Sequence, residues 1–153
     1  MSAPKYRKRS DYRFFLVYRT RWSDNDQYGH LNNSIYNFLI DSVVNSYLIE
    51  HCGLQPTDTN SAQIGLVVSS HCSYFESLAF PELVELGLRV DKLGTSSVIY
   101  EVGFFRQAHD RACAVGGFVH VFVDRESRRP VKALEAKMKE GLGKLAVMPK
   151  AAL

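Results

Sequence analysis

A long, mostly apolar segment at residues 33–52 constrains the fold of this chain more than any other feature. Its polar residues recur at intervals that place them on one narrow stripe of an α-helix. Large apolar residues take up most of the remaining circumference, so we expect the helix to need cover on nearly every side. Gly53 is suited to end the helix. The polar stripe consists of Ser34, Asn37, Asp41 and Asn45, and the opposite side holds Tyr36, Leu39, Ile40, Val43 and Tyr47.

Extended segments before and after this helix in the sequence can form a sheet that covers it. Residues 14–21 are rich in aromatic and β-branched side chains, which predicts a strand before the helix. The short turns between the extended runs after the helix favour antiparallel neighbours. The order of elements predicts an α+β fold in which a five-stranded antiparallel sheet wraps around a long central helix. The runs after the helix span residues 65–75, 82–93, 97–106 and 112–124.

The length of 153 residues suits a single domain, which we place at residues 13–145. Residues 1–12 are basic, and we expect them to form a flexible N-terminal arm. We interpret their charge as that of a solvated tail, and contact with an anionic ligand or nucleic acid is the alternative. A short charged helix is expected at 134–145, followed by a C-terminal tail at 146–153.

Composition excludes several classes of protein. Hydrophobic residues make up 46% and charged residues 23% of the chain, as in ordinary soluble domains. No apolar run reaches the roughly 18 residues of a membrane span, and the N-terminus lacks the apolar core of a signal peptide. We therefore expect a cytoplasmic protein, with a mitochondrial location as the alternative. The three cysteines are far apart, so neither a metal site nor a disulfide framework is expected.

The densest polar segment, residues 22–33, joins the first strand to the helix. A helix N-terminus presents unpaired N–H groups and roughly half a positive charge, which can stabilise a developing oxyanion. A carboxylate such as Asp26 could act beside it as a base or a nucleophile. On the residues alone, the simpler interpretation is that Asp24, Asp26 and the asparagines Asn32 and Asn33 only form the turn and cap the helix.

The pattern W-x-D-x-D-x-x-G-H-x-N-N over residues 22–33, followed by Ile-Tyr on the helix, resembles the hotdog-fold acyl-CoA thioesterases. It is most similar to the 4-hydroxybenzoyl-CoA thioesterase-like branch of that family. The resemblance covers roughly residues 14–125 and includes a later Gly-x-Ser-Ser at 94–97. It implies hydrolysis of an acyl-CoA to the free acid and CoA in lipid metabolism, with no cofactor.

The resemblance assigns roles to four residues of this segment. Asp26 matches the catalytic carboxylate, which acts either as nucleophile or as general base. Asn33 matches the residue whose backbone N–H polarises the thioester carbonyl. Gly29 and His30 match the loop that shapes the pocket, and His30 either orders the turn or takes part in proton transfer.

Other residues are expected to support the substrate or the loop. Asp24 is expected to be structural, and Glu76 is the reserve candidate for a catalytic carboxylate. Tyr36 lies early in the helix and either lines the acyl pocket or belongs to the core. The full set of expected substrate-binding residues is Tyr28, Tyr36, Arg89, Lys92, Ser96 and Ser97, of which the last four are candidates for the CoA phosphates.

The resemblance also implies a homo-oligomer, because subunits of that family pair so that two sheets run on as one, with active sites at the interface. A dimer or a tetramer is expected, and a lone sheet with open edges fits that expectation. No nucleic-acid partner is expected. Two alternatives stay open, a non-catalytic acyl-thioester-binding protein and an acyl-thioester hydratase or dehydratase. The absence of histidine from residues 33–49 counts against the second.

Overall fold

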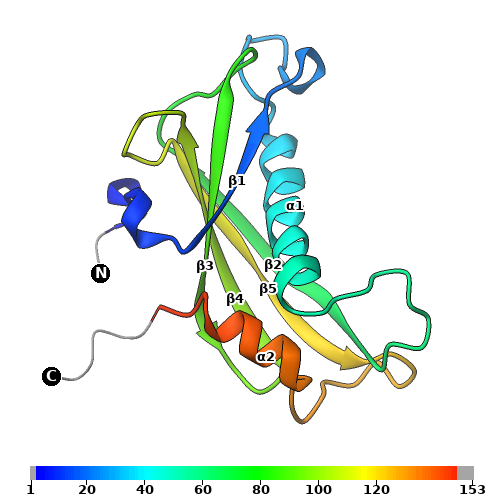
Figure 1. Cartoon of the computed structure of the whole chain (residues 1–153). Helices are drawn as coiled ribbons and strands as arrows, with labels where there is room; N and C mark the ends of the chain where they lie inside the picture. Colours follow the sequence, from blue (N-terminus) through cyan, green and yellow to red (C-terminus); the bar gives the residue numbers. More distant parts are fainter. Residues whose placement is uncertain (1–2, 148–153) are drawn as a thin grey trace, which may run out of the picture.

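The structure is a computed structural model that describes residues 3–147. It confirms the α+β fold: one antiparallel sheet with a long helix packed against it (Figure 1). Three short 3-10 turns, η1 (Pro4–Tyr6), η2 (Arg9–Asp11) and η3 (Trp22–Asp24), lie in the N-terminal part. The main elements are β1 (Phe14–Arg19), α1 (Asn33–His51), β2 (Gln63–Tyr74), β3 (Leu83–Leu93), β4 (Ser97–Arg106), β5 (Ala114–Asp124) and α2 (Ala136–Gly143).

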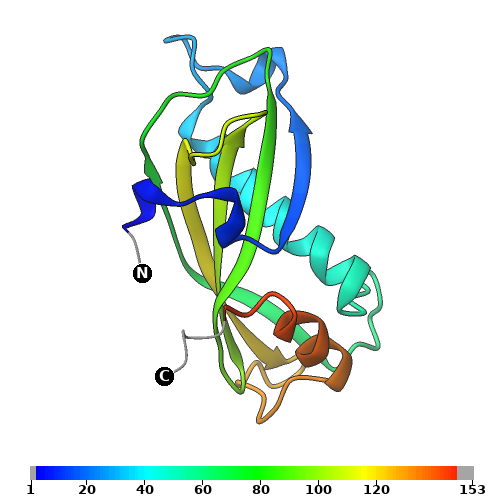
Figure 2. The same cartoon turned by 60° about the vertical axis from the view of Figure 1, so that its left-hand side comes forward.

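The five strands lie in the order β1-β3-β4-β5-β2, and every neighbouring pair is antiparallel. The strands β1 and β2 therefore form the two edges of the sheet. The pairing of β2 with β5 shifts register between Val67 and Ser69, which marks a bulge in the edge strand. Seen from two directions, the sheet is strongly twisted and curves around α1 (Figures 1 and 2).

The core lies between α1 and the inner face of the sheet. Burial of each large apolar side chain there is worth roughly 1.5–3 kcal/mol, so the helix is held mainly by packing. The sheet does not cover α1 completely within one chain, since Phe38 and Ile49 of α1 are 68% and 50% exposed. The buried residues of α1 are Tyr36, Leu39, Ile40, Val43, Val44, Tyr47 and Leu48.

The N-terminal segment differs from the flexible arm that its composition suggested. It lies across the outer face of the sheet, opposite α1 (Figure 2). Arg7 is only 4% exposed, and its Nε lies 2.8 Å from Oε2 of Glu101. The Tyr12 hydroxyl donates to the same carboxylate at 3.0 Å. The Tyr12 ring packs so closely on Gly103 that a Cβ there would lie 2.6 Å from the ring. The charge of Arg7 therefore serves a buried ion pair, whereas Lys5, Lys8 and Arg13 are exposed.

The C-terminal helix α2 is shorter than the predicted helix and packs beside α1. The Tyr47 hydroxyl donates to the carbonyl of Gly141 at 2.6 Å, which joins the two helices. After α2 the chain returns to the sheet, where Ala146 forms a bridge with Val90. The rest of the expected C-terminal tail, residues 148–153, lies outside the described residues. Neither helix within residues 3–147 combines the length and apolar character needed to cross a bilayer.

Candidate active site

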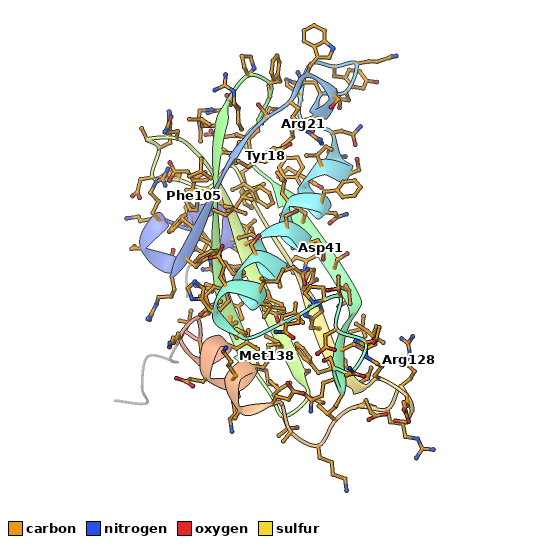
Figure 3. All side chains as sticks on the ribbon, turned by 45° about the vertical axis from the view of Figure 1, so that its right-hand side comes forward. Tyr18, Arg21, Asp41, Phe105, Arg128 and Met138 are labelled. Atoms are coloured by element: carbon orange, nitrogen blue, oxygen red, sulfur yellow. The ribbon has the colours of Figure 1, made fainter. Side chains whose placement is uncertain are left out.

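The polar loop between β1 and α1 is anchored by Asp24, which is fully buried. Its carboxylate accepts hydrogen bonds from the Tyr18 hydroxyl at 2.5 Å and from the Arg21 backbone N–H at 2.7 Å. Burial raises the pKa of Asp24, but the bonds from Tyr18 and Arg21 outweigh it and hold that pKa below its usual value. Tyr18 and Arg21 lie at the loop end of the molecule (Figure 3). Asp24 is thus positioned to order the loop, as expected.

Asp26 is half-buried and closes a tight turn with the residues that follow it. Its Oδ1 accepts from the backbone N–H groups of Tyr28 at 2.8 Å and His30 at 3.4 Å. Its own N–H donates to the His30 carbonyl at 2.8 Å. Gly29 has φ of 78°, a conformation that a residue with a side chain adopts only with strain. The glycine therefore permits the turn that holds the Asp26 carboxylate.

The helix begins beside this carboxylate. Asn32 is the N-cap, and its side-chain oxygen accepts from the Ser34 backbone N–H at 3.0 Å. Within residues 3–147, the backbone N–H of Asn33 donates no hydrogen bond. An N–H at the first position of the helix is therefore left for a bound group.

A cavity of about 300 Å³, termed here the main cavity, connects these features. Of the predicted catalytic residues, Asp26, His30 and Asn33 line it, while Gly29 shapes the loop without lining it. Tyr36 is buried at its inner side, 4.8 Å from Tyr74 between ring centroids. Burial raises the pKa of Tyr36 to about 12, so the phenol stays neutral. The complete lining is Asp26, Tyr28, His30, Leu31, Asn33, Tyr36, Tyr74, Phe75, Glu76 and Ser77.

The end of β2 and the segment after it supply four more side chains to the main cavity. The aromatic character of Tyr74 and Phe75 suggests an apolar pocket for the acyl group, and Glu76 is the reserve carboxylate, whereas Ser77 gives no sequence signal. Glu76 lines the main cavity with 64% of its side chain exposed, and its Oε2 lies 3.6 Å from Nη1 of Arg106. The cavity therefore contains a second carboxylate, which the fold brings to Asp26 from a distant part of the chain.

The predicted phosphate-binding residues do not join the main cavity within one chain. Arg89 is 2% exposed, with its Nε 2.8 Å from Asp91 and 3.2 Å from Glu101, so its predicted role is wrong. Its charge already serves the ion-pair network under the N-terminal segment. Lys92, Ser96 and Ser97 lie at or beside the β3–β4 turn. That turn is at the far end of β3 from Leu83, which pairs with Arg19 near the Asp26 loop (Figure 1).

The donor groups of the chain do not form a metal site where the structure can be described. No set of three or more His, Cys, Asp or Glu side chains within residues 3–147 could hold a metal ion. The cysteines Cys52, Cys72 and Cys113 are unpaired, and burial raises the pKa of each thiol. The polar groups that line the main cavity include the carboxylates of Asp26 and Glu76, His30 and the first residue of α1.

A long helix wrapped by one antiparallel sheet, with a polar cavity at the helix N-terminus, defines a hotdog-fold protein. The chain belongs to the thioesterase-like superfamily, whose family model matches residues 20–151. This membership confirms the family resemblance drawn from the loop motif.

The chain is also similar to individual proteins. The chain is 48% identical to the PA5185 protein of Pseudomonas aeruginosa strain PAO1, with a TM-score of 0.86 and coverage of 92% of this chain and 96% of that one. It is 25% identical over 124 residues to the uncharacterized protein YsmA of Bacillus subtilis, covering 80% and 81% of the two chains. The probable thioesterase YbaW of Escherichia coli shares the fold at 19% identity and a TM-score of 0.74, covering 87% of this chain and 98% of that one.

Proposed function

We propose that this protein hydrolyses acyl-CoA thioesters to the free acid and CoA. The observation that carries the proposal is the meeting of the Asp26 carboxylate and the unbonded Asn33 N–H in one cavity. A thioester carbonyl placed there would have an acidic side chain beside its carbon and a donor beside its oxygen. Membership of the thioesterase-like superfamily supports the same reaction.

The hydrogen bonds of Asp26 indicate which oxygen would react. Oδ1 is held by the N–H groups of Tyr28 and His30, whereas Oδ2 accepts no hydrogen bond from the described part of the chain. As general base, Oδ2 would take a proton from water while the water oxygen adds to the carbonyl carbon. As nucleophile, Oδ2 would itself add and form a mixed anhydride that water then cleaves. In both routes the C–S bond breaks and CoA leaves as the thiolate.

The helix N-terminus would stabilise the charge that develops on the carbonyl oxygen. The Asn33 N–H is fixed by the helix before substrate arrives, so it needs no rearrangement during the reaction. His30 contributes through its backbone, because its N–H and its carbonyl both bind Asp26. This gives His30 a positioning role in the proposed mechanism. The aromatic inner side of the main cavity, at Tyr36 and Tyr74, is suited to the acyl group.

We also propose a homodimer formed through the edge strand β2. Its outward edge is unpaired in one chain, and the apolar side chains of Val67 and Val68 are 49% and 60% exposed. Long exposed edges of this kind favour pairing with another strand. Antiparallel pairing of two β2 strands would bring the partner's β3–β4 turn toward the Asp26 end of this chain. Lys92, Ser96 and Ser97 would then serve the CoA phosphates of the neighbouring site.

A panel of acyl-CoAs tests the proposed reaction. Purified protein is incubated with acetyl-, hexanoyl-, palmitoyl- and benzoyl-CoA, and released CoA is measured with a chromogenic thiol reagent. We expect catalytic release from at least one member. Binding of these acyl-CoAs by calorimetry without release from any of them would refute hydrolysis and indicate a non-catalytic thioester-binding protein.

A further inference from the structure

A separate cavity, termed here the His120 cavity, lies at the end of α1 that is remote from Asp26. It has a volume of about 180 Å³ and lies where the C-terminal half of α1, the start of β2 and the end of β5 come together (Figure 1). It shares no lining residue with the main cavity. Leu48, which lines it, is about 22 Å along the helix from Asn33 at a rise of 1.5 Å per residue. The two cavities are therefore distinct within one chain.

The ring of His120 is fixed at the inner side of this cavity. His120 is only 5% exposed, and its centroid lies 5.5 Å from that of Phe122. A Cβ at Gly65 would lie 3.2 Å from Nδ1 of His120, so the glycine leaves room for the ring. Nδ1 also lies 3.3 Å from the hydroxyl of the fully buried Tyr100. Because residues 3–147 offer this phenol no other partner, the phenol donates and Nδ1 accepts.

The other ring nitrogen, Nε2, is a donor that faces the cavity. Burial lowers the pKa of His120 to about 4, so the ring is neutral near pH 7 and carries its single proton on Nε2. Every fully enclosed side-chain nitrogen or oxygen in the described part of the chain has a hydrogen-bond partner. Nε2 has no partner among residues 3–147, so it is not enclosed and reaches the open volume that the ring lines. A bound acceptor would satisfy this donor.

Arg125 gives the same cavity a positive charge. Its Nε donates to the Ser61 carbonyl at 2.7 Å and its Nη2 donates to the Asp58 carbonyl at 3.2 Å, which fixes the guanidinium without neutralising it. Arg125 forms no ion pair with any residue from 3 to 147. No Asp or Glu of these described residues lines the cavity. The charge is therefore suited to bind an anion.

Apolar side chains lie between the two polar groups. Leu48 and Phe122 are buried in the wall of the cavity, and Leu54 and Ile64 extend it. The backbones of His120 and Arg125 are about 16 Å apart at the rise of an extended chain. The two groups are therefore suited to opposite ends of one molecule, an anionic end at Arg125 and a neutral acceptor at His120.

We infer that the His120 cavity binds a small carboxylic acid that carries a second oxygen at its other end. The carboxylate contacts Arg125, the apolar chain packs against Leu48 and Phe122, and the second oxygen accepts from Nε2 of His120. One chain supplies all of these groups. The inference goes beyond the proposed thioesterase function and does not depend on it.

Calorimetry with ω-hydroxy acids tests this inference. Acids of about four to eight carbons are used, because the cavity is smaller than those that hold drug-sized ligands. Purified wild-type protein at pH 7 is titrated with each hydroxy acid, with the unsubstituted acid and with the diol of the same length. We expect saturable binding of at least one hydroxy acid. The matching acid and diol should bind at least about 10-fold more weakly, because each lacks one of the two hydrogen-bonded ends.

Variants locate the bound acid. Arg125→Gln removes the charge but keeps an amide that can donate to the loop carbonyls, and we expect it to weaken binding at least about 10-fold. Arg129→Gln removes an exposed arginine outside the cavity lining and is the matched control. His120→Leu should bring the affinities for the hydroxy and the unsubstituted acid within about twofold of each other. If His120→Leu does not fold, the Arg125→Gln variant and the wild-type ligand series decide the result.

Two further measurements separate this site from other anion sites. Asp26→Asn alters the main cavity alone and should leave the affinity for the hydroxy acid unchanged. Inorganic phosphate lacks the apolar chain and should not bind at the same concentrations. The inference is overturned if no acid binds, if phosphate binds equally well, or if binding survives Arg125→Gln but is lost in Asp26→Asn. Failure of the proposed function would be seen separately, in the acyl-CoA panel.

Discussion

Replacing Asp26 with asparagine separates its chemical role from its structural one. Asparagine has the same shape and keeps an oxygen where Oδ1 accepts from the Tyr28 N–H at 2.8 Å. The turn should therefore persist, and we expect the free energy of unfolding to change by less than about 0.5 kcal/mol. The variant loses the negative charge and the proton-accepting Oδ2. General base catalysis contributes roughly 10²- to 10⁴-fold, so kcat should fall by at least about 100-fold.

Two further variants make this result interpretable. Asp26→Ala also removes the acceptor of the turn, so it should lose about 1 kcal/mol of stability in addition to activity. Asp41→Asn is the matched control, because Asp41 is an exposed carboxylate on α1 whose Oδ1 accepts from Asn45 at 3.0 Å. Its position on the helix is seen in Figure 3.

The assay is steady-state release of CoA from the best substrate of the panel, with urea denaturation of each variant in parallel. A kcat for Asp26→Asn within about threefold of wild type would refute the assignment of Asp26 as the catalytic carboxylate. Glu76 in the same cavity would then be the candidate. A large loss of stability in Asp26→Asn would refute the expectation that a neutral oxygen at the Oδ1 position keeps the turn intact.

Two other predictions concern assembly and pH. Val68→Glu places a charge on the exposed edge of β2. Analytical sedimentation should therefore show this variant as a monomer at concentrations where wild type is a dimer. A monomeric wild type would contradict the proposed assembly. His120 is buried, which lowers its pKa from 6.5 to about 4. Below pH 6.5 the unfolded state therefore takes up a proton that the folded state does not. The free energy of unfolding should decrease by about 3 kcal/mol between pH 6.5 and 4. Replacement of the histidine in His120→Leu should remove that part of the decrease. A pH dependence of stability identical to that of wild type in His120→Leu would contradict this role of His120.

The sequence by itself determined the fold class and the position of the polar loop that lines the main cavity. The wide apolar surface of residues 33–52 demanded a wrapping sheet, and short turns between the later strands made that sheet antiparallel. Both are local properties of periodicity and spacing. The start of α1 is predicted for the same reason, whereas Asp26 became the catalytic candidate only through the family resemblance, since spacing does not distinguish a catalytic carboxylate from a turn residue.

Only the tertiary structure decided what surrounds that loop. Glu76 and Tyr74 join Asp26 because α1 and the end of β2 meet in space, which no spacing along the chain reveals. The composition of the N-terminal segment predicts a solvated tail, but Arg7 is bonded to Glu101, 94 positions away. Charge alone cannot show whether a side chain is solvated or paired, since that depends on which distant carboxylate the folded sheet presents to it.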